Sequence, residues 1–358
     1  MSESISVAFL HPEQQTVTDV TESLVAFLAS AREEVTVAIY DFSVDGPPAD
    51  AIAATLQELD RSGVRVRMVD HDERVNDYKS TVPAPQKPPE FIDSLGLDVR
   101  PVTDRYGLMH HKYAIVDGSR LWTGSLNWTE DAFALQENCF LIVEDVAIAS
   151  MYLANFEEFW TSREVEGTGA HDHETRSLEC KGDTVGVRPI FCPGRGPELA
   201  SEIAAAMRHS RERILTCSPV LTSGPILGAL SDVVDRDGLR ISGVVDGSMM
   251  RGVMRQWDRD TSDSWEPAAY RFLARRLNLV GRPSTPWGPH RPHDYMHAKV
   301  IVCDEHAYVG SYNHSRSGEE NVENVLALTG GCAVADLATE VEKVIERYSD
   351  GDNGAEPE

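Results

Sequence analysis

The order of apolar and polar residues divides the chain into strands and helices that occur twice in the same sequence. Residues 7–42 contain an apolar run, a stretch with helical spacing and a second apolar run, which predict strand, helix and strand. Residues 45–70 add a helix and a strand ending in Val-Asp at Asp70. The same order returns from Val187, and its last strand ends in Val-Asp at Asp246. The pattern indicates a duplicated α/β unit.

The duplication suggests a division into two domains, residues 1–165 and 186–348. Residues 166–185 are polar, contain glycine and lack a sustained period, so we expect a linker there. Residues 349–358 form an acidic tail that we expect to be disordered. Long loops are expected at residues 81–89, 249–264 and 282–291. They either shape a substrate entrance or are surface excursions.

Each half contains one copy of a short motif, MHHKYAIVD at residues 109–117 and MHAKVIVCD at residues 296–304. The first copy contains His110, Lys112 and Asp117, and the second has His297, Lys299 and Asp304 at the same spacing. Polar and glycine positions follow each copy: Gly124, Ser125, Asn127 and Glu137 after the first, and Gly310, Ser311, Asn313 and Glu323 after the second. The second set lies one residue closer to its histidine. A single deletion in the turn of a predicted hairpin explains this offset.

These residue types suit chemistry at a phosphate diester, whose negative charge repels nucleophiles. A neutral imidazole is a competent nucleophile near pH 7, and a protonated one can give a proton to a leaving alkoxide. Lysine charges and asparagine and serine donors can bind the non-bridging oxygens. Strand alternation places His110 and Lys112 on one face, so we expect His111 to pack on the other side.

The paired motifs, H-x-K-x4-D followed by G-S-x-N, resemble those of the phospholipase D superfamily, and the second copy is one residue short before its Gly-Ser. The resemblance implies an α/β fold of two similar halves, each a mixed sheet flanked by helices, related by a pseudo-twofold axis and sharing one active site. It also implies a two-step reaction through a phosphohistidine, without a metal or other cofactor. His110 is then the expected nucleophile and His297 the general acid.

The resemblance extends to the residues around the histidines. Glu137 and Glu323 are each expected to fix an imidazole tautomer, and Lys112 and Lys299 to neutralise the phosphate. Ser125, Asn127, Ser311 and Asn313 are expected to contact the phosphate. Asp117 and Asp304 lie at hairpin ends, and together with Gly124 and Gly310 they are expected to have structural roles.

Composition changes this picture in three respects. The net charge of −25 disfavours a surface that binds polyanions, although a local basic pocket can override it. The 6 cysteines lie scattered without a CxxC pair, which favours reduced core thiols. No apolar run in the sequence is long enough to form a membrane-spanning helix, so we expect a cytoplasmic protein or one peripheral at the membrane.

The motifs leave the substrate open. A phospholipid is the leading hypothesis, because both motifs are intact in one chain. A nuclease acting on DNA or RNA is the alternative: Arg251, Arg255, Arg282, Arg291 and Arg316, with Trp257, Trp265 and Trp287, could form a basic and aromatic rim, unless these arginines pair with neighbouring acids. A non-catalytic scaffold that binds phosphate esters is a third hypothesis. Because both half-sites lie in one chain, a monomer suffices.

Overall fold

The computed structural model describes residues 4–42, 46–71, 89–102, 107–259, 264–286, 288 and 291–349. The expected loop at residues 81–89 lies outside this range except for Pro89, and so do the tail from residue 350 and Trp287.

The first half alternates strands and helices as the sequence predicts. Its elements are β1 (Ile5–Leu10), α1 (Val17–Ala29), β2 (Glu34–Ile39), α2 (Pro47–Arg61), β3 (Arg65–His71), α3 (Pro89–Ser94), β4 (Asp98–Val102), β5 (Lys112–Val116), β6 (Arg120–Gly124), α4 (Glu130–Ala134), β7 (Asn138–Glu144) and α5 (Val146–Ser162).

The second half repeats that order with additions. Its elements are β8 (Arg176–Cys180), β9 (Asp183–Phe191), α6 (Gly196–His209), β10 (Arg213–Ser218), α7 (Gly224–Val233), β11 (Arg240–Asp246), α8 (Gly247–Arg259), α9 (Glu266–Ala274), β12 (Asn278–Arg282), β13 (Val300–Cys303), β14 (His306–Gly310), α10 (Arg316–Glu320), β15 (Asn324–Thr329) and α11 (Gly331–Ser349).

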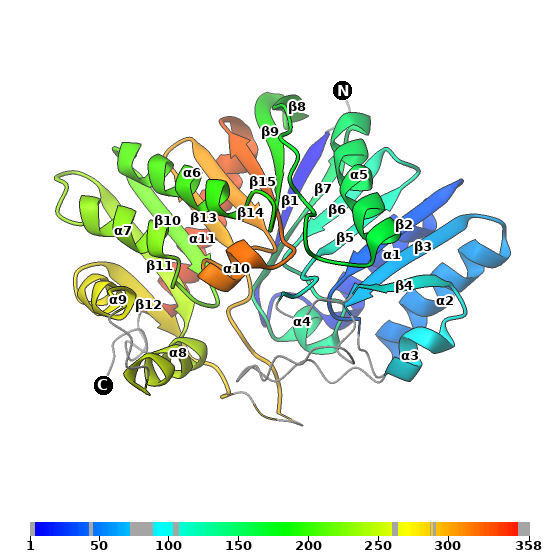
Figure 1. Ribbon diagram of the computed structural model, residues 1–358, viewed down its shortest axis with the longest axis horizontal. Helices are drawn as coiled ribbons and strands as arrows, with labels where there is room; N and C mark the ends of the chain where they lie inside the picture. Colours follow the sequence, from blue (N-terminus) through cyan, green and yellow to red (C-terminus); the bar gives the residue numbers. More distant parts are fainter. Residues whose placement is uncertain are drawn as a thin grey trace.

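The strand orders of the two sheets confirm the duplication. The first sheet runs β1-β7-β6-β5-β2-β3-β4, and the second runs β12-β11-β10-β13-β14-β15-β9-β8. Read from the opposite edge, the second sheet has the order of the first with β8 added. In each sheet the three strands that precede the motif are parallel, and the motif strand runs antiparallel to the first of them. Figure 1 shows the two sheets side by side.

Two long helices hold the halves together. Helix α5 packs on the first sheet and also contacts β9, whereas α11 packs on the second sheet and also contacts β1. Tyr152 and Phe156 of α5 share one buried hydrophobic cluster with Leu337 and Val341 of α11. The outer faces of the sheets have separate cores, formed with α1 and α2 in the first half and with α6 and α7 in the second. The halves therefore share an interior, which fixes their relative position.

The one-residue offset between the motifs lies in the hairpin turn, as predicted. Val116 pairs with Arg120 across the first turn, and Cys303 pairs with His306 across the second. The first turn thus has three residues between its paired strands and the second has two. Asp117 lies in the first turn, and its carboxylate accepts backbone hydrogen bonds from residues 32–34 at 2.8–3.1 Å. Asp304 does the same for residues 211–213 at 2.7–3.0 Å, so both aspartates join the hairpin to the loop before the neighbouring strand.

Gly124 and Gly310 end the second strand of each hairpin where another strand lies too close for a side chain. A Cβ atom on Gly310 would lie 2.0 Å from the carbonyl oxygen of Asn324, and one on Gly124 would lie 2.2 Å from that of Cys139. Backbone approach therefore requires glycine at both positions.

One pair of cysteines contradicts the expectation of reduced thiols. Cys180 in β8 and Cys332 in α11 form a disulfide, with their Cα atoms 6.0 Å apart. Because 152 residues separate them, no local spacing pattern could reveal the pair. The other cysteines (Cys139, Cys192, Cys217 and Cys303) are free and buried.

Two expected irregular segments are partly regular. Residues 249–259, expected to be a loop, belong to helix α8, whose buried Met250 and Met254 are four residues apart. The expected linker at residues 166–185 contains β8 and the start of β9, which form a hairpin at the edge of the second sheet. Both segments gain their order from packing against the second half rather than from local sequence.

Replacing Gly310 with alanine should lower the free energy of unfolding by about 1–3 kcal/mol, because the new methyl group collides with a backbone oxygen that cannot move freely. The matched control is Gly252→Ala in α8, where a Cβ atom meets nothing within 4 Å. Alanine is a better helix former, so this control should gain up to about 1 kcal/mol. Urea denaturation measures both, and equal stability of the two variants would contradict the steric explanation.

Candidate active site

The two motif histidines lie where the backbones of the halves meet. The backbone N–H of His110 donates to the carbonyl of Val322 at 2.9 Å, and the N–H of Val322 donates to the carbonyl of Leu108 at 2.8 Å. The N–H of His297 donates to the carbonyl of Glu137 at 3.0 Å. Each motif strand therefore begins against the segment that precedes the last strand of the other half. The structure brings the two motifs together at this junction.

His110 is held by the opposite half. Its Nδ1 atom lies 2.9 Å from each carboxylate oxygen of Glu323, which is fully buried. The ring of Tyr40, at the end of β2, packs edge-on against the imidazole with 4.7 Å between ring centroids. With Nδ1 engaged by Glu323, the other ring nitrogen, Nε2, is the one left for a substrate.

The two lysines are buried beside the histidines. Lys112 Nζ donates to the carbonyl of His110 at 2.7 Å, and Lys299 Nζ donates to the carbonyl of His297 at 2.6 Å. Only 1% of each lysine is exposed. Lys112 Nζ also lies 4.9 Å from the centroid of the Tyr40 ring. Strand alternation thus places each lysine next to its own histidine, as the sequence predicts.

Burial and the lysine charges keep both imidazoles neutral. Burial lowers the pKa of His110 well below its usual range, and repulsion from Lys112, Lys299 and His297 lowers it further. Burial likewise lowers the pKa of His297, and Lys299 and Lys112 add to this effect. These four groups lie close enough to one another to influence each other's pKa. A neutral imidazole has a lone pair available for attack or for proton transfer.

Burial also acts on the other charged groups of the site. It raises the pKa of Glu323 to about 8, although Lys112, the Ser311 hydroxyl and Lys299 act in the opposite direction. It lowers the pKa of Lys299 well below its usual range, and Lys112 lowers it further. Without an anion the site therefore disfavours the cationic forms of these groups, and a bound phosphate diester would favour them by raising their pKa values.

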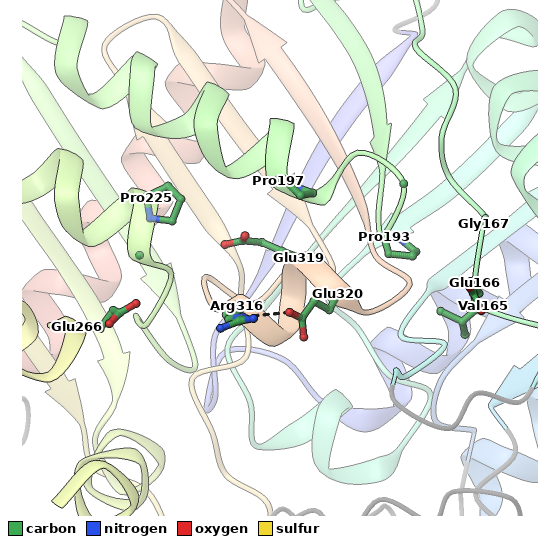
Figure 2. Close-up of a pocket in the computed structure, with 12 residues that line it drawn as sticks. Val165, Glu166, Gly167, Pro193, Pro197, Pro225, Glu266, Arg316, Glu319 and Glu320 are labelled. Atoms are coloured by element: carbon green, nitrogen blue, oxygen red, sulfur yellow. Dashed lines mark hydrogen bonds and ion pairs between the residues drawn. The ribbon is translucent and has the colours of Figure 1, made fainter. Parts of the chain in front are cut away.

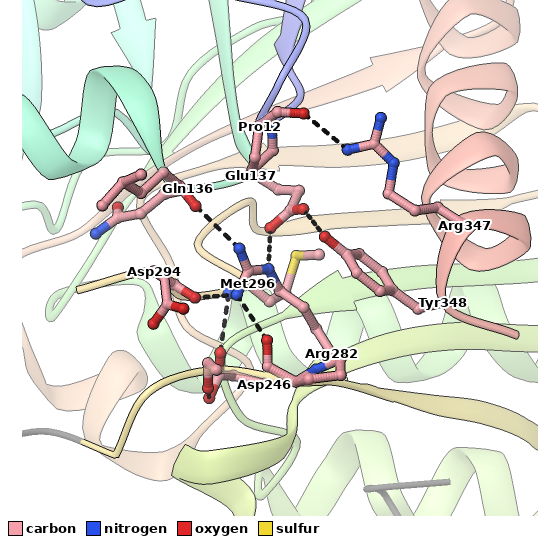
Figure 3. A network of polar contacts seen from close by, with 12 residues as sticks. Pro12, Gln136, Glu137, Asp246, Arg282, Asp294, Met296, Arg347 and Tyr348 are labelled. Carbon is pink, nitrogen blue, oxygen red and sulfur yellow. Dashed lines mark hydrogen bonds and ion pairs between the residues drawn. The ribbon is translucent and has the colours of Figure 1, made fainter. Parts of the chain in front are cut away.

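The surroundings of His297 differ from the expectation. Its Nδ1 atom lies 3.0 Å from Oδ1 of Asn138, whereas the carboxylate of Glu137 binds Arg282 and the hydroxyl of Tyr348. The distance from Arg282 Nε to Glu137 Oε2 is 2.5 Å. Figure 3 shows this network around Glu137. Glu137 therefore does not contact the imidazole that it was expected to orient.

The Gly-Ser-x-Asn segments separate into two kinds of residue. The Ser125 hydroxyl donates to Asn138 Oδ1 at 2.7 Å, and the Ser311 hydroxyl accepts from the backbone N–H of Asn324 at 3.0 Å, so both serines bind the neighbouring strand. The Oδ1 atoms of Asn127 and Asn313 are buried and have no hydrogen-bond partner in the structure as described. The asparagines thus retain hydrogen-bonding capacity, whereas the serine hydroxyls are already engaged.

His111 packs on the other side of the strand, as predicted. Its Nε2 atom lies 2.9 Å from Asn155 Oδ1, and its Nδ1 atom lies 3.0 Å from Asn324 Nδ2. Burial lowers the pKa of this histidine to about 3, which keeps the ring neutral. His111 is therefore a hydrogen-bonded core residue that joins the two halves.

Sequence reasoning missed Tyr40, Asn138 and Tyr348, and it placed Arg282 in a basic rim rather than against Glu137. Tyr40 and Arg282 lie at the carboxyl ends of parallel strands, which is the edge where α/β sheets place their sites, and this rule could have indicated them. Tyr348 reaches Glu137 from the last turn of α11, across more than two hundred residues, and no sequence signal indicates that contact.

The arginines proposed for a basic rim have different environments. Arg282 is buried against Glu137, and Arg316 pairs with Glu320 at 3.0 Å. Arg251, Arg255 and Arg291 have no acidic partner within the residues that the structure describes. The expectation that these arginines pair with acids therefore holds for some of them only.

A separate cavity of about 760 Å³ lies near the first turns of α6, α7, α9 and α10. Figure 2 shows the residues around it, which include Glu166, Glu266, Glu319, Glu320 and Arg316. None of the motif histidines or lysines is among its lining residues. Because carboxylates predominate over Arg316, this cavity is unsuited to a phosphate diester.

No group of three or more histidine, cysteine, aspartate and glutamate side chains in the part of the chain that the structure describes is arranged to hold a metal ion. Nor does any helix within it have the length and apolar character needed to cross a membrane.

Comparison with known families agrees with this geometry. A family model described as "Cardiolipin synthase, PLD-like domain" matches residues 24–160 and 203–348, which together cover most of both halves. The chain belongs to this phospholipase D-like family, and the resemblance seen in the sequence is confirmed.

Curated relatives share part of their length with this chain. A mitochondrial cardiolipin hydrolase of Xenopus laevis is 36% identical over 137 residues, which are 38% of this chain and 59% of the relative. The human mitochondrial cardiolipin hydrolase is 34% identical over 137 residues, 38% of this chain and 49% of that protein. The chain therefore matches only about half of the length of these relatives.

Solved structures support the fold of the whole chain. The phosphatidylserine synthase of Haemophilus influenzae Rd KW20 superimposes with a TM-score of 0.67 at 10% identity, covering 96% of this chain and 86% of that one. The polyphosphate kinase of Porphyromonas gingivalis gives a TM-score of 0.57 at 11% identity, covering 97% of this chain and 51% of the kinase. At these identities the likeness establishes the two-half α/β architecture alone.

Replacing Lys299 with methionine should abolish any activity at this site yet raise the free energy of unfolding by about 1–3 kcal/mol. The low pKa of Lys299 in the folded state means that its proton is held more weakly there than in the unfolded chain. The gain should therefore be present at neutral pH and vanish as the pH rises above about 10, where unfolded lysine loses its proton.

The control for this prediction is Lys343→Met, which removes an exposed lysine paired with Glu340. It should change stability by less than about 1 kcal/mol. Thermal and urea unfolding at several pH values provide the measurement. A loss of stability in Lys299→Met at neutral pH would show that the buried ammonium group stabilises the fold.

Proposed function

We propose that this protein is a metal-independent phosphodiesterase or transphosphatidylase of the phospholipase D type, acting on a phospholipid through a phosphohistidine. The single observation that carries the proposal is the convergence of two neutral imidazoles with two buried ammonium groups at the junction of the halves. A phosphate diester needs a nucleophile, an acid and neutralisation of its charge, and these four side chains supply all three.

The reaction proceeds in two balanced steps. In the first, Nε2 of His110 forms a bond to phosphorus while the bond from phosphorus to one ester oxygen breaks, and His297, which takes up a proton at Nε2 when the anionic substrate binds, gives that proton to the departing alkoxide. In the second, His297 takes a proton from water, the resulting oxygen attacks phosphorus, and the bond to His110 breaks. An alcohol in place of water gives transfer instead of hydrolysis. Lys112 and Lys299 neutralise the non-bridging oxygens throughout.

The contacts of His110 support its role as nucleophile. An imidazole that has formed a bond to phosphorus becomes positively charged, and the carboxylate of Glu323 at 2.9 Å from Nδ1 compensates that charge. Asn127 and Asn313 can offer their amide N–H groups to the non-bridging oxygens, because an amide nitrogen donates and an amide oxygen only accepts. The serines hold strands together and contribute indirectly.

The relatives named as cardiolipin hydrolases favour a lipid over a nucleic acid. Helix α8 fits an anionic surface of either kind. Its Arg251, Arg255 and Arg259 are four residues apart and therefore share one side of the helix, and none has an acidic partner among the described residues. The helix begins directly after Asp246, whose carboxylate accepts the backbone N–H of Met296, the residue before His297, at 3.0 Å.

Exposed apolar side chains near α8 favour the lipid. Trp265 and Phe272 are 50% and 40% exposed, and α9, which carries Phe272, is joined to α8 by the ion pair of Arg271 and Asp258. Arginine combined with exposed aromatic residues is typical of surfaces that contact a bilayer interface. On a protein with a net charge of −25, the three arginines of α8 are a local basic group suited to an anionic membrane.

The chemistry predicts hydrolysis of bis(p-nitrophenyl) phosphate in excess chelator. His110→Asn should release no nitrophenolate. His297→Asn should release about one equivalent per protein and then stop, because nitrophenolate leaves without a proton but the phosphoenzyme lacks its base. Acid-labile phosphate should then remain on the His297→Asn protein.

The control is His306→Asn, which alters an exposed histidine in the second hairpin and should retain full turnover. Two results would contradict the mechanism: turnover that requires an added divalent ion, or a phosphoenzyme that forms on the His110→Asn protein.

The substrate class is tested by binding at low salt. Replacing Arg251, Arg255 and Arg259 together with glutamine should weaken binding to cardiolipin-containing vesicles by one to two orders of magnitude, at about 1 kcal/mol for each arginine. A control triple variant replaces Arg61, Arg65 and Arg240, which already have acidic partners, and should bind normally. If these variants instead affect labelled single-stranded DNA and vesicles do not bind, the nuclease alternative is correct.

A further inference from the structure

The two motif histidines are oriented by chemically different groups. A carboxylate, Glu323, lies against Nδ1 of His110, and an amide, Asn138, lies against Nδ1 of His297. The amide oxygen of Asn138 is identified by its other contacts, since Nδ2 donates to the carbonyl of Ala132 at 3.1 Å and Oδ1 accepts from the Ser125 hydroxyl at 2.7 Å. Nδ1 of His297 must therefore be the donor in its contact with Asn138.

One rule explains both contacts. In each case, the side chain that reaches the imidazole belongs to the residue immediately after the carbonyl that accepts the histidine N–H. The N–H of His110 donates to Val322, and Glu323 follows. The N–H of His297 donates to Glu137 itself, and Asn138 follows.

The two junctions therefore differ in register by one residue. Met109 forms an isolated parallel β-bridge with Val322, the residue before Glu323. Met296 forms the corresponding β-bridge with Glu137 itself. The sequence motifs are in equivalent positions, but the backbone pairing is not. This displacement exchanges the carboxylate for an amide at His297.

Arg282 contacts the chain on both sides of the junction at His297. Its guanidinium binds the Glu137 carboxylate and the carbonyls of Leu135, Pro283 and Asp294. These contacts join the first-half segment before Asn138 to the second-half segment that leads to His297 (Figure 3). In the second sheet, Arg282 pairs with Asp246 on the neighbouring strand. The equivalent partner of Asp70 in the first sheet is Pro101, which has no charge.

We propose that Asn138, rather than Glu137, is the positioning residue for the His297 imidazole, and that Arg282 and Tyr348 retain Glu137 in a separate buried network. The catalytic meaning of this assignment rests on the proposed function. The assignment gives the two histidines different tasks. His110, next to a carboxylate, is suited to become cationic when it binds phosphorus. His297, next to an amide, keeps its Nδ1 proton in a fixed place, which leaves Nε2 to take up and release the proton that is transferred.

The groups that face His297 determine what a substitution does. Lys299 comes from its own strand, Lys112 and His110 from the first half, and Asn138 from the start of β7. All the charged members of this set are cationic, so a carboxylate at position 138 would be the first anion in contact with the ring. It would favour the imidazolium form.

The test is an NMR titration of His297 in labelled full-length protein, assigned with the His297→Asn variant. In Asn138→Asp the pKa of His297 should rise by one unit or more relative to wild type. In Asn138→Ala the ring should lose its fixed tautomer, with a larger fraction protonated at Nε2. Tyr348→Phe and Glu137→Gln, which alter only the neighbouring network, should leave both the pKa and the tautomer of His297 in place.

The opposite pattern overturns the proposal: a response of His297 to Glu137→Gln or Tyr348→Phe, with none to Asn138→Asp or Asn138→Ala. Tyr348→Phe removes a single hydroxyl and retains the ring next to Arg282, so it remains informative if Glu137→Gln fails to fold. Because NMR needs no turnover, the positioning of His297 can be established even if the proposed function fails.

A kinetic readout links the positioning to the reaction. In the phosphoenzyme, the cation on His110 keeps Glu323 ionised, so the increase with pH in the rate of phosphoenzyme breakdown reports the deprotonation of His297. With bis(p-nitrophenyl) phosphate, Asn138→Asp should shift this increase to higher pH by the amount seen in the NMR titration. An unshifted profile alongside a shifted NMR pKa would show that His297 is not the base.

Discussion

The backbone hydrogen bonds between the halves are the constraint on which the site depends. The backbone N–H of each motif histidine donates to a carbonyl of the opposite half. His110 donates to Val322 of the second half, and His297 donates to Glu137 of the first. These bonds determine which side chain reaches each imidazole, because strand geometry points consecutive residues to opposite sides. A shift of one residue at either junction would replace the group that contacts the ring. The shared core of α5 and α11 makes such a shift difficult, since the halves cannot slide without exposing it.

The positive charge available at the site comes from two buried lysines, whose surroundings include the carboxyl group of Glu323. Two lysines lie buried with their ammonium groups on the carbonyls of the histidines, and the carboxylate closest to them contacts an imidazole. Charge of this kind is unfavourable in the empty protein and becomes favourable when an anion arrives. The hairpin bonds of Asp117 and Asp304 and the close backbone contacts at the motif glycines supply the rigidity that this arrangement requires.

Much of the fold could be predicted from the local sequence pattern, because the strands, helices and turns of each half have the residue spacing typical of such elements. The strands of each half, the hairpins with their one-residue offset, and the opposite orientations of His110 and His111 follow from alternation and turn chemistry. The disulfide and helix α8 were missed for a different reason. Cys180 and Cys332 are brought together by packing over 152 residues, and α8 is ordered by its contact with the second core. These contacts form only in the folded protein, so they could not be predicted from one segment of the sequence.

The same limit explains why Glu137 was assigned a role that the structure gives to Asn138. Both glutamates follow their motifs at matching positions, so the sequence presents the halves as equivalent. A symmetric pair of identical subunits would have to be equivalent, because each contact in one interface is repeated in the other. Two halves in one chain are free of that requirement. Arg282 lies in the second sheet where the first sheet has Pro101, and the two histidines differ in their surroundings as a nucleophile and a proton carrier should.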